Sequence, residues 1–352
     1  MKINTKTTSY FAAANGYDGF RSYFDRVFPS EAYDRIFVLK GGPGTGKNRL
    51  LRTLGDTFGD AGCGREDILC SSDPSSLDGL ILTYGNHRVA FLDGTAPHER
   101  DAVVPGCIDE LINLGGNWNV DALVRRRAEI LTLNKRKKKS YEKGYDYLSL
   151  SGFIDRKIEA VYKASASYEK VTDAAADLAQ TLPPCEGTGG VRLVSAFCRY
   201  GRVTLNTLEA LPEKYLVCGE RCARNVFMSS LLHALSRRGQ GYFRYPSPMA
   251  DNITEALTLP SHGIAILTEA QDSDEGMHRV ELPRPEESDI RARIARLSEI
   301  RDESLLRACA AFSAASEAHF ALEDIYTAAM DFEKNDEITQ DLIRRTQTIL
   351  TR

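Results

Sequence analysis

The spacing of apolar residues divides the chain into short strand-like runs and longer helix-like segments. The runs "RIFVLK" (35–40) and "EDILC" (66–70) are apolar and rich in β-branched residues, which predicts two buried strands. "LILTY" (80–84) and "RVAFLD" (88–93) are separated only by "GNH", so we expect a hairpin whose second strand lies inside a sheet. Residues 48–62 carry apolar side chains at helical spacing and end at a glycine, which predicts an amphipathic helix.

Two segments of roughly sixty residues, 120–182 and 288–350, have apolar residues at helical spacing with charges between them. Ile290, Ile294 and Leu297 show this period. We expect each segment to form antiparallel helices packed as a hairpin. The stretch "TLPPCEGTGG" is rich in proline and glycine and predicts a linker between two halves.

The same order of segments occurs twice along the chain. "IFVLKGGPGTGKNRLL" (36–51) aligns with "KYLVCGERCARNVFMS" at an offset of 178 residues, and "RVAFLDG" aligns with "GIAILTE" (263–269) at 175. "IEAVYKASASYEK" (158–170) aligns with "LEDIYTAAMDFEK" (322–334) at 164. This shared order indicates an internal duplication. The first half has 11 additional residues within 95–119, which we interpret as a substrate or gating element, with an ordinary loop insertion as the alternative.

The stretch "GGPGTGKN" (41–48) follows a predicted strand and precedes a predicted helix. This context and the spacing G-x-x-x-x-G-K are typical of a phosphate-binding loop, in which glycines allow backbone N–H groups to surround phosphate oxygens. Lys47 would neutralise the outer phosphates. The expected nucleotide-binding residues are Gly41, Gly42, Pro43, Gly44, Thr45, Gly46, Lys47 and Asn48.

Two residues are candidate ligands of a magnesium ion. Asp93 ends an apolar strand 46 residues after Lys47, where a phosphate-loop protein needs an acid for the Mg²⁺ shell. Asn48 stands where Ser or Thr normally supplies a metal-ligating hydroxyl. Its amide oxygen is a longer and differently directed ligand, so we expect nucleotide binding to persist and turnover to be weakened.

The residue that would orient the attacking water is less defined, because Gly94 follows Asp93 directly. Asp73, His98 and Glu99 are candidates, with a loop cap or a surface position as the alternative for each. The expected catalytic set is Lys47, Asp93, Asp73 and Glu99.

In the second half the corresponding stretch is "GERCARNVF", in which Arg224 and Asn225 replace Gly46 and Lys47. Thr268 stands in place of Asp93. We therefore expect a degenerate copy that binds no nucleotide and packs against the first half as a pseudo-symmetric partner. Arg221 and Arg224 are candidates for an arginine that reaches the nucleotide from across the interface, although exposed arginines usually face solvent.

At "LKGGPGTGK", "CSSDPSSLDG", "DGTAPH" and "IYTAAMDFEK" the chain resembles a largely uncharacterised family of bacterial tandem P-loop ATPases. The resemblance spans nearly the whole chain and implies an α/β protein with a P-loop NTPase fold duplicated in tandem. Each half would be followed by a helical hairpin. The expected division is a nucleotide-binding module at 1–119, a helical hairpin at 120–182, a linker at 183–190, a degenerate module at 191–287 and a second hairpin at 288–352.

Composition limits the remaining alternatives. The net charge is −4, so a general attraction to nucleic acid or membranes is not expected, and the basic run 135–139 is interpreted as a solvated helix face. No stretch approaches the length of an apolar membrane span, and the eight cysteines form no CxxC pair, which favours reduced thiols and a cytoplasmic location. No guanine-reading "NKxD" pattern stands in a suitable place, which favours ATP.

The sequence therefore predicts an ATP-binding protein with weak or regulated Mg²⁺-dependent ATPase activity in its first half. A non-hydrolysing nucleotide sensor or scaffold, whose helical segments bind a protein partner, is the first alternative. A small-molecule kinase is the second.

Overall fold

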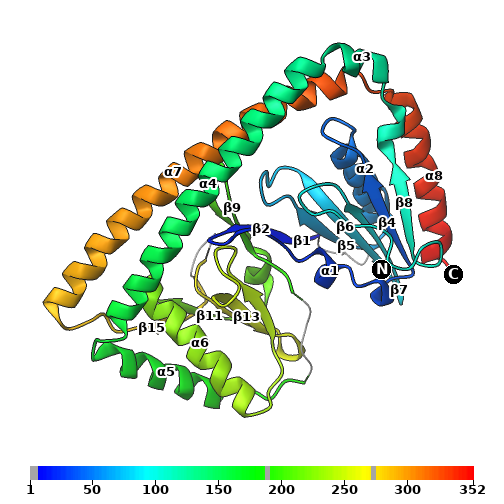
Figure 1. Ribbon diagram of the computed structural model, residues 1–352. Helices are drawn as coiled ribbons and strands as arrows, with labels where there is room; N and C mark the ends of the chain where they lie inside the picture. Colours follow the sequence, from blue (N-terminus) through cyan, green and yellow to red (C-terminus); the bar gives the residue numbers. More distant parts are fainter. Residues whose placement is uncertain (1–6, 187–190, 271–274) are drawn as a thin grey trace.

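The computed structural model describes residues 7–186, 191–270 and 275–352 and shows a mixed α/β protein with two larger sheets (Figure 1). The first sheet contains β1 (Thr8–Phe11), β4 (Arg35–Lys40), β5 (Gly64–Leu69), β6 (Leu77–Tyr84), β7 (His87–Asp93) and β8 (Asp109–Asn113). Its strand order is β1-β5-β6-β7-β4-β8. Strand β4 is parallel to both β7 and β8, whereas β6 is antiparallel to both of its neighbours.

The second sheet repeats this plan. It contains β11 (Glu213–Cys218), β12 (Phe243–Pro246), β13 (Thr254–Leu259), β14 (Ile264–Leu267) and β15 (His278–Glu281) in the order β12-β13-β14-β11-β15. The strand pairs are antiparallel, antiparallel, parallel and parallel along that order, as they are from β5 to β8 in the first sheet. Apart from β1, which has no counterpart in the second sheet, the two sheets thus share one strand order and one set of strand directions.

The strands and the helix predicted in the first half are confirmed. Strand β4 buries Ile36 to Leu39, as expected for a continuously apolar strand with neighbours on both sides. Helix α2 (Lys47–Asp60) buries Leu50, Leu51, Leu54 and Phe58 on one face, because these positions recur at helical spacing. The predicted hairpin is β6–β7, and β7 lies inside the sheet between β6 and β4. The helix that follows β11 is α6 (Arg221–Arg237).

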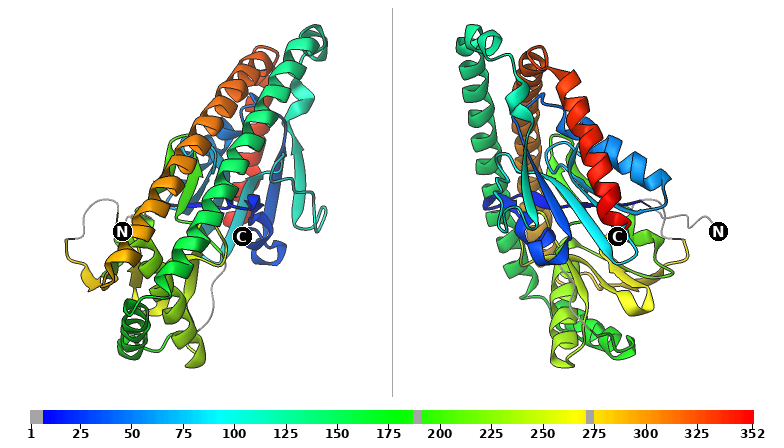
Figure 2. Two further views of the ribbon diagram at one scale, coloured as in Figure 1. Left: turned by 60° about the vertical axis from the view of Figure 1, so that its left-hand side comes forward. Right: turned by 90° about the vertical axis from the view of Figure 1, so that its right-hand side faces the viewer.

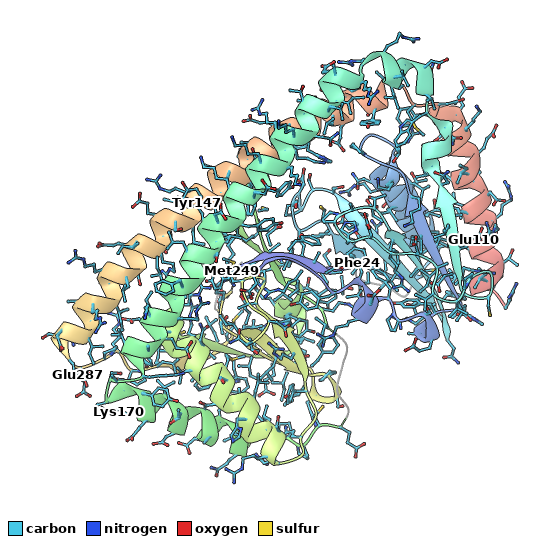
Figure 3. All side chains as sticks on the ribbon, viewed as in Figure 1. Phe24, Glu110, Tyr147, Lys170, Met249 and Glu287 are labelled. Carbon is cyan, nitrogen blue, oxygen red and sulfur yellow. The ribbon has the colours of Figure 1, made fainter. Side chains whose placement is uncertain are left out.

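A short hairpin precedes each sheet module. Strands β2 (Ala13–Gly16) and β3 (Gly19–Ser22) form one, and β9 (Ser195–Cys198) and β10 (Gly201–Thr204) form the other. Both lie between the two larger sheets, where β2 packs against β9 (Figure 1). The backbone N–H of Tyr17, in the first turn, donates to the carbonyl of Met249 in the second half (2.9 Å; Met249 is labelled in Figure 3). The hairpins therefore join the halves.

Two long helices form one side of the molecule. Helices α4 (Arg127–Tyr162) and α7 (Ser288–Thr327) run antiparallel along each other (Figures 1 and 2). They approach closely at Gly144, where a β-carbon would lie 2.4 Å from the ring of Phe312. Arg136 of α4 pairs with Glu317 of α7 at 3.0 Å. The long helix of each half therefore has its main partner in the other half.

The expectation that each helical segment folds back on itself as a hairpin needs correction. Helix α5 (Ser167–Thr181), which follows α4, packs on α6, and its core includes Val171, Tyr162 of α4 and Phe227 of α6. Helix α8 (Phe332–Leu350), which follows α7, packs on the first sheet and α2. Leu342 and Ile349 of α8 share a core with residues of β4 and α2. Each half thus supplies one helix that packs into the core of the other half, beside that half's own helix α2 or α6.

The remaining short helices are α1 (Phe24–Val27), α3 (Val120–Arg125) and the 3-10 turns at Ser30–Ala32, Leu114–Asn117 (η2), Thr207–Ala210 and Pro260–His262. Of the predicted linker 183–190, residues 187–190 lie outside the described residues. Among the helices of the described part of the chain, none combines the length and the apolar character needed to cross a membrane.

Candidate functional site

The loop from Gly41 to Gly46 connects β4 to the first turn of α2. Gly41, Gly44 and Gly46 have φ values of 152°, 70° and 80°, a region that favours glycine. A β-carbon on Gly41 would also lie 2.9 Å from Thr45 Oγ1, and that hydroxyl donates to the carbonyl of Gly42 at 2.9 Å. The loop therefore needs its glycines to fold tightly against the start of α2, where the first backbone N–H groups of the helix have no intrahelical acceptor.

Lys47 lies within this loop. Its Nζ donates to the carbonyl oxygens of Gly41 and Gly42, the latter at 2.9 Å. It also lies 3.6 Å from Asp93 Oδ2, and both side chains are only 12% exposed. The ammonium group of Lys47 thus lies against the loop carbonyls and beside the buried carboxylate of Asp93.

Asp93 is the last residue of β7, and the parallel register places it beside Leu39 at the end of β4. Its Oδ1 accepts from the backbone N–H of Thr95 (2.9 Å) and from the Thr95 hydroxyl (2.6 Å). Burial raises the pKa of Asp93, while the charges of Lys47 and His98 oppose this shift. One carboxylate oxygen is therefore fixed by Thr95, and the other faces Lys47.

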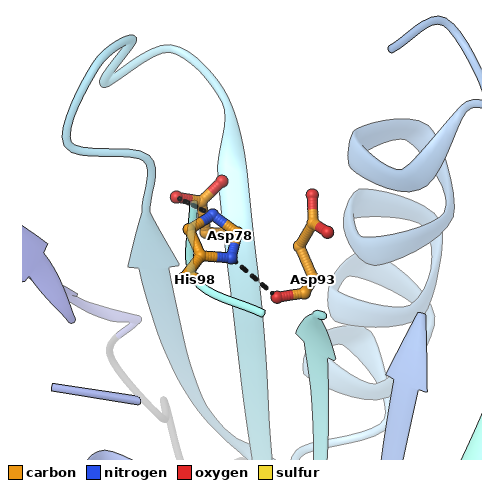
Figure 4. A group of neighbouring side chains, drawn as sticks. All are labelled: Asp78, Asp93 and His98. Atoms are coloured by element: carbon orange, nitrogen blue, oxygen red, sulfur yellow. Dashed lines mark hydrogen bonds and ion pairs between the residues drawn. The ribbon is translucent and has the colours of Figure 1, made fainter. Parts of the chain in front are cut away.

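Asp78 and His98 complete a buried group around Asp93 (Figure 4). The Nδ1 of His98 lies 2.9 Å from the carbonyl oxygen of Asp93, and its Nε2 lies 3.4 Å from Asp78 Oδ2. The imidazole also stacks on the ring of Phe24 at 4.5 Å and an interplanar angle of 4°. Asp78 was not among the predicted site residues, although a carboxylate in the apolar run "LDGLILTY" is the signal that could have found it.

The surroundings of His98 favour its charged form. Burial alone disfavours an imidazolium, but the hydrogen bond and the charge of Asp78, together with Asp93, raise the pKa of His98 from 6.5 to about 8. A charged imidazole donates from both nitrogens, as these two acceptors require. His98 therefore neutralises Asp78 and positions the end of β7, which disfavours the predicted role as general base. The Asp78, Asp93 and His98 ligand atoms lie within 4.8 Å of one another, but a cation there would compete with this proton.

His98 is expected to make the stability pH-dependent. Because its folded pKa is raised above 6.5, its contribution is fully present below about pH 6.5 and is lost as pH rises through about 8. The full contribution is about 2 kcal/mol. Urea unfolding of the wild type and of His98→Gln at about pH 6 and about pH 9 measures it, and the difference between the two proteins should shrink at the higher pH. A difference that does not change with pH would show that His98 is not held charged.

Asn48 has a structural contact that the sequence did not reveal. Its Oδ1 accepts from the backbone N–H of Leu77 at 3.0 Å, which ties the first turn of α2 to the start of β6. Nearby, Arg52 donates to the carbonyl of Ser75 at 2.5 Å. The amide oxygen expected to ligate metal thus already has a donor, and Asn48 and Arg52 together hold the start of β6 and the 70–76 loop beside α2.

The other predicted residues have different surroundings. Asp73 lies in the 70–76 loop, accepts from the Ser75 hydroxyl at 2.7 Å and lies 3.7 Å from Arg199 of the second half. Glu99 is exposed on the loop after β7. Of the acids predicted to orient water, Asp73 is therefore the one that the fold places beside a residue of the second half.

The second-half counterpart of the glycine loop is much shorter. Gly219, with a φ of 148°, keeps the conformation of Gly41, but α6 begins at Arg221, so Arg224 and Asn225 lie in the helix. Arg224 donates to the carbonyl of Thr268 and lies 3.8 Å from Glu269. The sequence predicts a degenerate loop at 219–226. In the structure most of this stretch belongs to α6, so it is a helix and not a loop.

Arg221 is also engaged locally. Its guanidinium lies 3.4 Å from Asp155 and donates to the Tyr17 hydroxyl at 3.1 Å. Both arginines that were candidates for reaching the nucleotide therefore make their contacts around the start of α6, beside the second sheet.

Residues of the second half pack directly against the glycine loop. A β-carbon on Gly44 would lie 2.7 Å from the carbonyl oxygen of Glu323 in α7. The Asn335 side chain of α8 donates to the carbonyl of Thr45 at 2.8 Å. Beside Gly46, a cleft of about 230 Å³ lies between α2 and α8 and does not extend over Lys47. The sequence did not predict that the segment "IYTAAMDFEK" would lie here.

The region of the predicted insertion also packs against the glycine loop. It includes η2 and Trp118, whose ring would lie 3.3 Å from a β-carbon on Gly42. The backbone N–H of Asn119 donates to Ala329 (2.7 Å), and that of Asp331 donates to Asn117 (3.1 Å). The segment therefore joins the α7–α8 turn beside the loop, and whether it gates the site stays a prediction.

Comparisons of this chain with protein-family models, with curated proteins and with solved structures found no match. The assignment of a function therefore depends on the residues around Lys47.

Proposed function

We propose that residues 41–48 bind the phosphates of ATP together with Mg²⁺, in one copy of a P-loop module that is duplicated in tandem. The observation that carries the proposal is the position of Lys47. It lies in a glycine loop at a helix N-terminus and 3.6 Å from Asp93, which ends the parallel strand beside β4. A helix N-terminus with free N–H groups and a fixed cation favours a phosphate anion.

The residues present fit the proposed ligand. The loop amides and Lys47 would hold the phosphate oxygens, and the Asp93 oxygen that faces Lys47 would hold the metal, directly or through water. Magnesium would supply charge neutralisation between the outer phosphates. Of the acids predicted to orient water, Asp73 has the better position, because Arg52 ties its loop to α2 and Asn48 ties the strand that follows the loop to the same helix.

We further propose that turnover is weak and that the second half binds no nucleotide. Arg224 fills the region equivalent to the end of the glycine loop and is neutralised there by Glu269. Contacts of the glycine loop with Glu323 and Asn335 favour a nucleotide sensor as the second candidate function, because α7 and α8 belong to the other half. In that case ATP would bias the packing of the halves, whether or not it is hydrolysed.

Titration calorimetry with Mg-ATP tests the proposal. One nucleotide per chain is the expected result, and phosphate release measured on the same sample distinguishes a slow ATPase from a sensor. Absence of binding would contradict the proposed function, and two sites per chain would contradict the proposal for the second half.

Asn48→Thr is expected to raise the Mg²⁺-dependent rate of phosphate release with little change in ATP affinity, because it restores the hydroxyl that would ligate magnesium in a phosphate-binding loop. The same change removes the bond to Leu77 and should lower the free energy of unfolding by about 1 kcal/mol. Steady-state phosphate release and urea unfolding measure the two effects. An unchanged or lower rate would show that Asn48 does not limit turnover.

A further inference from the structure

The turn between β9 and β10 carries a second-half arginine toward the first half. Arg199 follows β9 directly, and its Nη2 lies 3.7 Å from Oδ2 of Asp73 in the first half. Its carbonyl accepts from the Cys309 thiol of α7 at 2.8 Å, which fixes the backbone of the turn. Arg199 therefore makes a charged contact across the two halves in the described structure.

The guanidinium of Arg199 is held in place but has unused donors. Its Nη2 donates to the Tyr200 hydroxyl, and the guanidinium lies over the ring of Tyr200 at 4.5 Å and over the ring of Phe320 at 4.7 Å. Its Nε is buried and has no hydrogen-bond partner within the described residues. At 3.7 Å, the ion pair with Asp73 is longer than a hydrogen bond. Arginine in such a setting has a fixed direction and spare capacity for an anion with several oxygens.

Both segments that contact Arg199 also border the glycine loop. The 70–76 loop is bonded to α2 through Arg52, which donates to the Ser75 carbonyl. On the other side, Phe320 follows His319, whose Nε2 lies 3.7 Å from Glu323, and the Glu323 carbonyl borders Gly44. Arg199 therefore contacts two segments, and each of them is connected to the glycine loop that contains Lys47.

Further positive charge faces this region. Lys137, from the basic run, is half-buried on α4, where burial lowers its pKa and Glu323 opposes the shift. Burial lowers the pKa of His319 to about 4, and the charges of Lys137 and Lys47 add to the effect. Asp73 and Glu323 are the nearby acids that act against these cations. Such surroundings favour a bound anion.

We propose that Arg199 is a second-half ligand for the outermost phosphate of the nucleotide held by residues 41–48, and that it exchanges Asp73 for that phosphate. This inference rests on the proposed function and assigns to Arg199 the role that the sequence suggested for Arg221 or Arg224. An ion pair with the third phosphate would distinguish the triphosphate from the diphosphate, since only the triphosphate carries that phosphate.

The test compares affinities for Mg-ATP and Mg-ADP in the full chain by titration calorimetry. Arg199→Ala should lose about ten- to a hundredfold in Mg-ATP affinity and less than about twofold for Mg-ADP. Arg199→Lys should retain part of the Mg-ATP affinity, because it keeps the charge without the planar donors. Asp73→Asn should strengthen Mg-ATP binding by releasing the arginine. Arg307→Ala, an exposed arginine of α7 paired with Glu303, is the control and should change neither affinity.

Thermal unfolding of each variant verifies that it is folded. If Arg199→Ala lowers the two affinities equally, Arg199 only shapes the loop and the inference is wrong. If neither affinity changes, Arg199 does not contact the nucleotide and the inference is wrong, while the proposed function stands. If the wild type binds neither nucleotide, both the inference and the proposed function are overturned.

Discussion

Replacing Lys47 with alanine is expected to lower the affinity for Mg-ATP by about ten- to a hundredfold, the loss expected for a charge-assisted hydrogen bond to phosphate. Lys47 is only 12% exposed and is fixed by two loop carbonyls, so little ordering is required when phosphate binds. Titration calorimetry at a fixed Mg²⁺ concentration measures the change.

Asn225→Ala is the matched control, because Asn225 occupies the equivalent position in the second half. It lies within α6 and should leave the affinity unchanged. Lys47→Ala also removes the cation beside Asp93, which raises the pKa of that buried carboxyl further, so thermal unfolding must accompany the titration. Equal affinities of wild type and Lys47→Ala would contradict phosphate binding by this loop.

Asp155→Ala is expected to lower the free energy of unfolding by about 3 kcal/mol or more. Asp155 of α4 lies 3.4 Å from Arg221 of α6 and 3.3 Å from Arg301 of α7, and it accepts a hydrogen bond from Tyr17. Its side chain is 14% exposed, so its loss would leave two arginines without their shared anion in a poorly solvated place. Urea unfolding, analysed for midpoint and slope, measures the effect.

Asp302→Ala provides the matched control. Asp302 also pairs with Arg301, at 2.8 Å, but its side chain is 59% exposed. Removal of such a surface pair should change stability by less than about 0.5 kcal/mol. Similar small effects of both changes would show that the contact between α4, α6 and α7 around Asp155 adds little to stability.

Local patterns predicted the strands and the first helix, because each depends on residues that are neighbours in sequence. The run at β4 and the helical spacing of α2 contain what is needed to define those elements. The same patterns could not predict which helix covers which sheet. An apolar face such as that of α8 indicates that it is buried, but any apolar surface of suitable shape can bury it. The partner of α8 is set by the path of α7, which only the three-dimensional structure shows.

The candidate site also contains residues that the sequence could predict and residues that it could not. Lys47 and Asp93 could be predicted because each occurs at a fixed position relative to the end of a predicted strand. Arg199 could not be predicted in this way. It lies in a hairpin turn, whereas its partner Asp73 lies in a loop more than a hundred positions earlier in the chain. The sequence shows that Asn48 is unusual for a phosphate-binding loop, but its bond to Leu77 depends on how α2 packs beside β6.

The exchange of helices between the halves also sets the order in which the protein can be completed during synthesis. The core beneath the first sheet joins Phe37 and Leu51 to Leu342 and Leu350, which are translated roughly three hundred residues later. Until α8 has left the ribosome, α2 is the first-half helix that packs on this core, and the part of the sheet that α8 covers lacks its apolar partner. Contacts between residues so distant in sequence form slowly, and exposed apolar surface attracts chaperones and other nascent chains. The first module to be translated is therefore among the last to be finished.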